Sequence, residues 1–299
     1  MLKKEISVEF RLLGPFSVRQ NGQHISNGLT GPALQILAYM LTFPDQSLRR
    51  EWLAEQIWPP EHPVSKQAFN TALWRLKKFL AQMPEVELRV QKDVLRLQVG
   101  ASVKVDSYAL EATQLISADA ETQLSQQDAQ SLQHAVDSWR GPFMDGANQE
   151  WILVSRERYH AAYTRALCML MRHTRRGKCF AKALDYGLQI MVEDPFWESV
   201  HCEVLCLLVL TGQRARALKQ HMKFCALLQK ELGIGPTAET AALASYIRGG
   251  MELKQTPNQI DADKTKSVAS SQRLHGFMRA VEESRAAIYE ALQHMHPTA

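Results

Sequence analysis

The stretch from Ser65 to Leu80 carries side chains that can bind nucleic acid on one side of an expected helix. At helical spacing, an apolar face is formed by Phe69, Leu73, Leu76 and Leu80. The opposite face carries polar, aromatic and cationic side chains, namely Gln67, Thr71, Trp74, Arg75 and Lys78, with Lys66 and Lys77 flanking it. Duplex DNA is the commonest partner for such a face, because its major groove admits one helix and its phosphates attract Arg and Lys. The alternative is a solvated amphipathic helix without a ligand.

The side chains of this face divide by the DNA groups that they suit. Thr71, Trp74 and Gln67 are the candidates for base edges, and Asn70 lies at the margin of the same face. The cations of the face contribute affinity but little sequence information, and we assign Arg75, Lys78 and Lys77 to phosphates. For Trp74 the sequence leaves a second interpretation open, in which the indole packs beneath a neighbouring hairpin.

The elements around this helix predict a winged helix. Two short strands are expected between Ser7 and Val18, with a hairpin turn at Asn21-Gly22. Helices follow at 32–42, with Thr30 as cap, and at 48–58, with Ser47 as cap; Arg49 and Arg50 in the second are further phosphate candidates. After the helix at 65–80, residues 87–99 alternate as a hairpin that turns at Lys92-Asp93 and carries Arg89, Lys92 and Arg96. In a winged helix, such a hairpin contacts phosphate or the minor groove; the alternative is a solvated cationic surface.

The charge of the chain is unevenly distributed. The 299 residues have a net charge of +4, and residues 1–106 hold 14 Lys or Arg against 10 Asp or Glu. Residues 107–299 hold 21 of each, and the cationic excess is densest from Lys66 to Lys104, with 8 cations against 3 anions. This asymmetry favours a nucleic-acid-binding face on the N-terminal domain and a different role for the rest.

The remainder of the chain is expected to be almost entirely helical. Trp139 to Phe143 breaks the pattern before a long helix at 150–174, and Ala183-Leu184 recurs as Ala217-Leu218, 34 residues later. This is the period of tetratricopeptide helix pairs. Residues 251–272 are expected to be a linker and residues 273–299 a C-terminal amphipathic helix, with Leu274, Phe277, Val281, Ile288 and Leu292 on one stripe that Arg285 interrupts. The five cysteines lack a CxxC pair, which favours buried apolar roles over disulfides or a metal site.

These phrases resemble, in order, the sequence pattern of SARP-type bacterial transcriptional activators. FRLLGPFSV, LQILAYML, WLAEQIW and SKQAFNTALWRLKKFL resemble the OmpR-type winged helix, although Asp93-Val94 stands where the family's wings commonly carry Gly-Tyr. WRGPF, ALDYGLQIMVEDPFWE, GQRARAL and LLQKELGIGP resemble the bacterial transcriptional activator domain that follows it. The resemblance covers roughly residues 6–250 and implies activation of transcription from directly repeated sites, usually as a dimer. It does not extend to the C-terminal tail.

The expected fold class is an α+β N-terminal winged helix-turn-helix at 1–106, followed by an all-α tetratricopeptide-like helical-repeat domain at 107–250. The expected function is a cytoplasmic, sequence-specific transcriptional regulator that binds promoter DNA as a homodimer and contacts RNA polymerase, with an unidentified small-molecule or protein signal. The alternative is a helical-repeat scaffold whose N-terminal module binds protein instead of DNA. No enzymatic motif, cofactor or metal site is predicted, and no apolar run approaches the ~20 residues of a membrane span.

Overall fold

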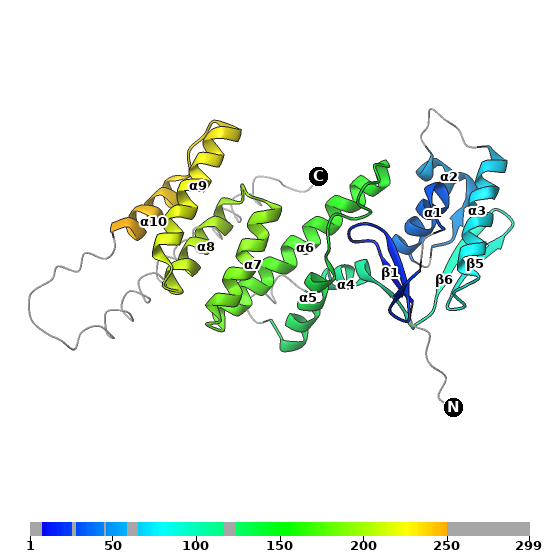
Figure 1. Ribbon diagram of the computed structural model, residues 1–299, viewed down its shortest axis with the longest axis horizontal. Coiled ribbons are helices and arrows are strands. Elements are labelled where there is room, and N and C mark those ends of the chain that lie inside the picture. The colour runs from blue at the N-terminus through cyan, green and yellow to red at the C-terminus, as the bar shows by residue number, and fades with distance from the viewer. Residues whose placement is uncertain (1–7, 26–27, 45, 59–64, 117–123, 250–299) are drawn as a thin grey trace, which may run out of the picture. The chain divides into compact units, whose positions relative to one another are not determined.

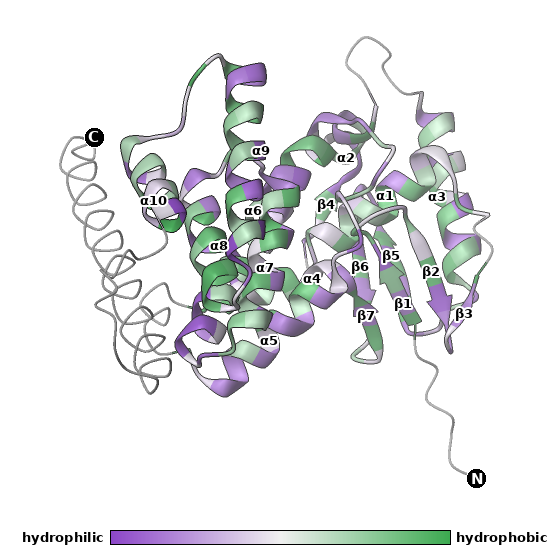
Figure 2. Cartoon of the chain, turned by 60° about the vertical axis from the view of Figure 1, so that its left-hand side comes forward, coloured by the Kyte–Doolittle hydropathy of each residue, from purple (hydrophilic) through white to green (hydrophobic). Residues whose placement is uncertain are grey.

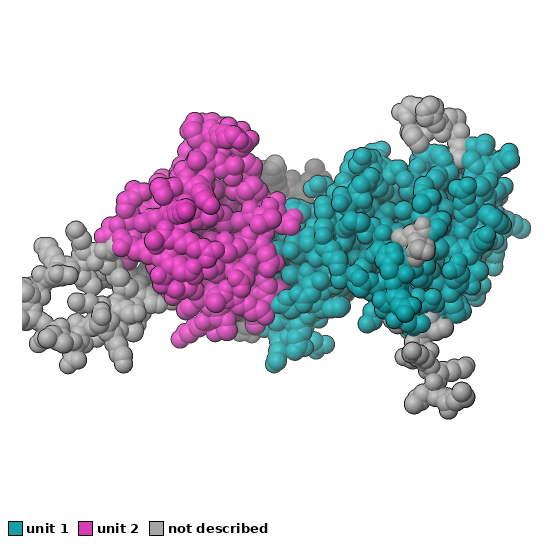
Figure 3. All heavy atoms as spheres, in the orientation of Figure 1, with its two compact units in different colours: residues 1–169 teal, residues 170–299 magenta. Residues whose placement is uncertain are grey.

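A computed structural model of the chain describes residues 8–25, 28–44, 46–58, 65–116 and 124–249. The chain divides into two compact units, Met1–Met169 and Leu170–Ala299 (Figure 3). The expected linker at 251–272 and C-terminal helix at 273–299 lie outside the described residues. The boundary expected between residues 106 and 107 lies within the first unit, and it remains a prediction.

The first unit opens with a four-stranded sheet. Its strands β1 (Val8–Arg11), β2 (Ser17–Gln20), β3 (Gln23–His24) and β7 (Val103–Val105) are arranged in the order β3-β2-β1-β7 (Figure 2). The helices that accompany the sheet in the first unit are labelled in Figure 1. β1 is antiparallel to β2 and parallel to β7. The predicted turn at Asn21-Gly22 joins β2 to β3, and the positive φ of both residues, 53° and 81°, explains why this residue pair stands there.

Three helices and a hairpin form the winged helix. The helices are α1 (Gly31–Thr42), α2 (Arg50–Ile57) and α3 (Lys66–Leu80), and the hairpin, called the wing below, pairs β5 (Val86–Gln91) with β6 (Val94–Val99).

The prediction of a helix starting at Leu48 with Ser47 as its cap is wrong. Leu48 and Arg49 instead form β4, which pairs with β6, and α2 begins at Arg50 with Arg49 at the N-cap position. Pairing with the wing outweighs the local helical pattern here.

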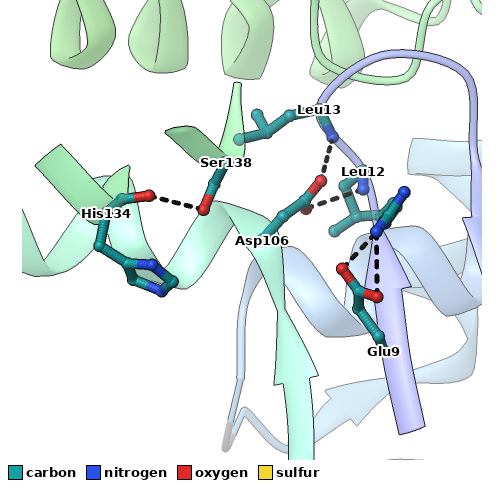
Figure 4. Close-up of polar contacts among 7 residues, drawn as sticks. Glu9, Leu12, Leu13, Asp106, His134 and Ser138 are labelled. Atoms are coloured by element: carbon teal, nitrogen blue, oxygen red, sulfur yellow. Dashed lines mark hydrogen bonds and ion pairs between the residues drawn. The ribbon is translucent and has the colours of Figure 1, made fainter. Parts of the chain in front are cut away.

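The first unit continues past the winged helix through α4 (Asp106–Thr113), α5 (Gln126–Ser138) and most of α6 (Glu150–Arg176). Asp106, at the start of α4, connects this helix to the chain that follows β1, and we call this connection the joint. One oxygen of its buried carboxylate accepts the backbone N–H of Leu12 at 2.8 Å, and the other accepts that of Leu13 at 3.0 Å (Figure 4). Burial raises the pKa of Asp106 to about 6, whereas the backbone N–H groups of Leu12, Leu13 and Ser107 act in the opposite direction.

Backbone hydrogen bonds reinforce this connection between β1 and the helices α4 to α6. The chain after β1 runs beside the segment before α6: Met144 N–H donates to the carbonyl of Leu12 at 2.7 Å, and Gly14 N–H donates to the carbonyl of Pro142 at 3.0 Å. Gly14 and Gly141 have φ of 103° and 151°, and a Cβ on Gly141 would lie 3.6 Å from the Cα of Gly14. The space would admit a Cβ, so the positive φ values, and not a close approach, favour glycine at both positions. The family phrases LLGPF and WRGPF, read separately from the sequence, are packed against each other.

The second unit contains the repeated helices. After the C-terminal end of α6 come α7 (Phe180–Glu193), α8 (Glu198–Leu210), α9 (Arg214–Leu232) and α10 (Ala238–Gly249). α8 packs against α7 and α9, and α10 packs against α8 and α9. The repeated alanines Ala183 and Ala217 occupy equivalent positions near the starts of α7 and α9, and both are fully buried. The expected helical repeat is confirmed.

A buried histidine stands out in this second unit. His201 of α8 is 0% exposed and stacks on Phe224 of α9 with the ring centroids 4.0 Å apart. Both of its ring nitrogens lack a hydrogen-bond partner within the part of the chain that the structure describes. Burial, with a smaller contribution from His221, lowers the pKa of His201 to about 4, and Glu198 opposes this effect.

We expect Asp106→Ala to destabilise the first unit by about 2–4 kcal/mol, because it leaves the buried N–H groups of Leu12 and Leu13 without acceptors. Asp106→Asn should cost less, since one acceptor oxygen remains. Asp145→Ala, at a nearby exposed carboxylate, is the matched control and should change little. Thermal denaturation of the full chain followed by circular dichroism measures all three, and equal stability of Asp106→Ala and the control would contradict the joint.

We also expect the second unit to lose stability in acid. The unfolded chain protonates His201 near pH 6.5 and the folded chain only near pH 4, so the unfolded state binds more protons between these values. Stability should be unaffected by His201 above about pH 6.5 and fall by up to about 3 kcal/mol as the pH drops to 4. Urea unfolding across this range measures the loss. His201→Leu should reduce it and exposed His134→Leu should not; identical pH profiles for the two variants would refute the assignment.

Candidate nucleic-acid interface

α3 divides into two faces as its sequence predicts. Its buried side contains Phe69, Leu73, Leu76 and Leu80, together with Ala72 and Phe79. All seven of its predicted DNA-binding residues are exposed: Gln67, Asn70, Thr71, Trp74, Arg75, Lys77 and Lys78. Figure 2 shows the hydrophilic and hydrophobic residues alternating along this helix. The apolar side holds the helix in the unit, which leaves the polar side available to a ligand.

Local chemistry fixes where α3 starts and favours its charge pattern. Ser65 caps the helix, and its hydroxyl oxygen accepts the backbone N–H of Ala68 at 3.1 Å. Lys77 and Lys78 lie in the last turn, where cations interact favourably with the helix dipole. The cationic residues of the face are therefore also compatible with the helix itself.

Trp74 projects from α3 into solvent. Its side chain is 61% exposed, so it does not pack beneath the wing, which was the second interpretation left open by the sequence. The Lys78 ammonium lies over its ring, 5.3 Å from the centroid. This cation–π contact presents an aromatic surface and a positive charge together on adjacent turns.

Two of the candidate base-reading residues are already engaged within the protein. The Thr71 hydroxyl donates to the carbonyl of Gln67 at 2.9 Å, which leaves its oxygen lone pairs for a donor on a base. The Asn70 side-chain oxygen accepts from Arg50 Nη1 at 2.9 Å. Asn70 therefore links α3 to the start of α2, a positioning contact that the sequence did not predict.

The wing is joined to the same helices. Arg50 N–H donates to the carbonyl of Asp93, at the wing turn, at 2.8 Å, and β4 pairs with β6. Lys92 forms the turn with a φ of 52°, a conformation that glycine or asparagine more often adopts. The contacts of Arg50 with Asp93 and Asn70 and the pairing of β4 with β6 thus hold α2, α3 and the wing together, and Arg49 of β4 is exposed beside them.

The outer surface of the wing concentrates positive charge. Arg89 and Arg96 are directly opposite each other across the hairpin and both are exposed. Glu87 neutralises part of this charge, because its carboxylate accepts from Arg89 at 3.0 and 3.1 Å. No ion pair to Arg96 is found among the described residues. Two like charges placed opposite each other weaken a hairpin, and a phosphate between them would offset that cost.

A groove of about 380 Å³ adjoins the outer face of α3 and was not predicted from the sequence. Pro32 and Ala33 of α1 and Trp58 border it on one side, and Gln67, Thr71 and Arg75 are among the α3 residues on the other. Thr30 occupies the N-cap position of α1 but makes no side-chain capping hydrogen bond. The sequence assigned a core face to α1, and no local pattern there indicates a groove, because residues of α1 and α3 border it together.

The cysteine, histidine and carboxylate side chains are the remaining candidates for a metal site. The described residues contain no group of three His, Cys, Asp or Glu side chains that could hold a metal ion. Cys206 is buried, and Cys202 lies with its sulfur 3.1 Å from the Thr240 hydroxyl. Among the described helices, none is long and apolar enough to cross a membrane.

Comparisons with known proteins agree with this architecture. Residues 105–248 match the family model of the bacterial transcriptional activator domain. Among solved structures, the chain is similar to EmbR of Mycobacterium tuberculosis in complex with a low affinity phosphopeptide, at 19% identity and a TM-score of 0.56. That match covers 93% of this chain and 72% of EmbR, and at this identity it establishes the fold. No curated protein sequence matches at a significant level.

The match at 105–248 begins at the end of β7, one residue before Asp106 opens α4. The matched region thus follows the winged helix directly along the chain. Residues 105–248 are thus a bacterial transcriptional activator domain, and a winged helix precedes it, which is the order of domains in the SARP-type regulators that the sequence resembles.

Proposed function

We propose that this regulator is an activator that binds promoter DNA through the exposed face of α3 and through the wing. The observation that carries the proposal is the framework described above, in which seven exposed polar, aromatic and cationic residues of α3 are held beside a wing that carries Arg89, Lys92 and Arg96. α3 enters the major groove and the wing contacts the backbone. Thr71, Gln67 and Trp74 contact base edges, and Arg75, Lys77 and Lys78 bind phosphates.

The residues at the start of α2 complete the phosphate contacts. Arg49 is exposed beside the wing, and Arg50 is partly committed to Asn70, so Arg49 contributes the more accessible charge. We further propose that the groove between α1 and α3 follows the DNA backbone, with Arg75 at its border binding a phosphate. Each phosphate contact adds affinity without sequence preference.

The proposal extends to the organisation and partners of the chain. We propose that residues 1–106 bind DNA, that residues 107–250 contact RNA polymerase and the second subunit of a homodimer, and that the protein acts in the cytoplasm. The family match at 105–248 supports the activator role. The remaining alternative is a scaffold whose N-terminal module binds protein; it predicts no affinity for duplex DNA at low salt.

The direct test compares two variants of α3 on two kinds of DNA. Thr71→Ala should weaken binding to a duplex selected from a random pool by about fivefold, since one neutral hydrogen bond is lost, and leave binding to unselected duplex unchanged. Arg75→Ala is the matched control on the next turn and should weaken both by a similar factor, because it removes a phosphate contact. Fluorescence anisotropy measures the four affinities. Equal losses on both duplexes for Thr71→Ala would remove its base-reading role.

Removing a negative charge from the wing should raise the affinity for duplex DNA. Glu87→Gln removes the carboxylate that pairs with Arg89 and takes one negative charge from the proposed DNA surface. We expect binding to unselected duplex at low salt to strengthen severalfold. Glu157→Gln, at an exposed position on α6, changes the net charge equally and serves as the control. If both substitutions change affinity alike, net charge explains the effect and the wing does not contact DNA.

A further inference from the structure

The second unit contains an apolar groove that the proposed DNA-binding surface does not use. The groove lies between α7 and α9, has a volume of about 280 Å³, and is lined by apolar side chains that include Met191, Val192, Phe224 and Leu227. The polar side chains of its lining are Gln220 and Lys223. Val192 is 80% exposed, so the groove presents apolar surface to water in the described part of the chain.

The dimensions and chemistry of this groove favour side chains of a peptide over a small molecule. Its volume lies at the lower limit of ligand pockets, which occupy roughly 300–1,000 Å³. Its one cationic side chain, Lys223, is exposed at the rim. An amphipathic helix that inserts one or two apolar side chains and places a carboxylate near Lys223 would match it.

The chain itself supplies a segment of this kind. Fifty residues, 250–299, follow Gly249, the last residue of α10. Their sequence carries the apolar stripe from Leu274 to Leu292, and Glu282 and Glu283 directly follow Val281 of that stripe. α10 packs on α8 and α9, so the polypeptide leaves the same compact unit that contains the groove.

The distance along the chain permits the segment to reach the groove. Leu274 lies 25 positions after Gly249. An extended chain of this length spans at most about 80–90 Å. A unit of the size of residues 170–249 has a radius of gyration of about 12 Å, so the whole of its surface is within reach. Tethering also gives the segment an effective concentration on the order of millimolar. A site with an intrinsic dissociation constant below about a millimolar would therefore be mostly occupied.

We propose that the groove between α7 and α9 is the docking site for residues 273–294 of the same chain. The stripe inserts apolar side chains between Val192 and Leu227, and Glu282 or Glu283 pairs with Lys223 at the rim. The docked segment covers the apolar surface of the helical-repeat unit. A protein partner that uses this groove must first displace the segment, which makes the tail a competitor for that surface.

Hydrogen–deuterium exchange of the purified full chain tests the docking. Backbone amides of residues 273–294 should exchange about tenfold more slowly in the wild type than in Val192→Asp, which places a carboxylate in the groove at a position too exposed to affect folding. Met222→Asp is the matched control, because Met222 is 59% exposed on α9 but does not line the groove. It should leave the tail protected. Fast exchange of the tail in the wild type, or equal protection in Val192→Asp, would overturn the proposal.

Two further experiments distinguish docking of the chain's own tail from docking of the tail of a second copy. Val281→Asp should release the tail as fully as Val192→Asp does, and the double variant should exchange no faster than either; additive effects would contradict a shared contact. In an equal mixture of isotope-labelled and unlabelled chains, a carbodiimide should join Lys223 to Glu282 or Glu283 within single chains. Links between labelled and unlabelled chains would instead assign the groove to the tail of a second copy, and would overturn the intramolecular site.

Discussion

The carboxylate of Asp106 holds the end of the first strand to the start of the activator domain, and the arrangement of the first unit depends on it. A buried carboxylate is costly unless donors satisfy it, and here the backbone N–H groups of Leu12 and Leu13 do so. The same stretch of chain then pairs with residues 142–145, where Phe143 forms a bridge with Leu13 and packs against Tyr159 of α6. The winged helix and the helices α4, α5 and the first part of α6 are consequently one compact unit.

Aromatic contacts add to the hydrogen bonds of Asp106 within the first unit. Tyr39 of α1 contacts Trp52 of α2 and Trp151 of α6, with ring centroids 5.4 and 4.9 Å apart. Arg156 of α6 donates to the carbonyls of Phe143, Met144 and Ala147, which fixes the turn before its own helix. Packed aromatic rings and backbone hydrogen bonds therefore connect the winged helix to α6. The helical repeats beyond residue 169 form a separate unit, in which α7 and α9 present a different surface for partners.

Local patterns in the sequence predicted most of this fold. The two faces of α3, the wing turn at Lys92-Asp93 and the 34-residue recurrence of Ala183 and Ala217 each follow from spacing within one or two elements. Three features required contacts between distant residues and were missed. Leu48 and Arg49 pair with the wing instead of opening a helix, Arg50 binds Asn70, and the LLGPF and WRGPF segments meet across more than a hundred residues. The groove beside α3 was missed for the same reason, since α1 and α3 form it together.

The most direct measurement of the central claim is the affinity of the full chain for unselected duplex DNA as a function of salt concentration. The full chain is required because a fragment ending at residue 106 would lack the pairing of Gly14 and Leu12 with residues 142–144. If α3 and the wing bind phosphates, the logarithm of the binding constant should fall linearly with the logarithm of salt, with a slope of about −0.9 for each phosphate contacted. Several phosphate contacts would make the binding constant fall steeply with salt concentration. An absence of binding at low salt, or an affinity that does not vary with salt, would contradict DNA recognition by this surface.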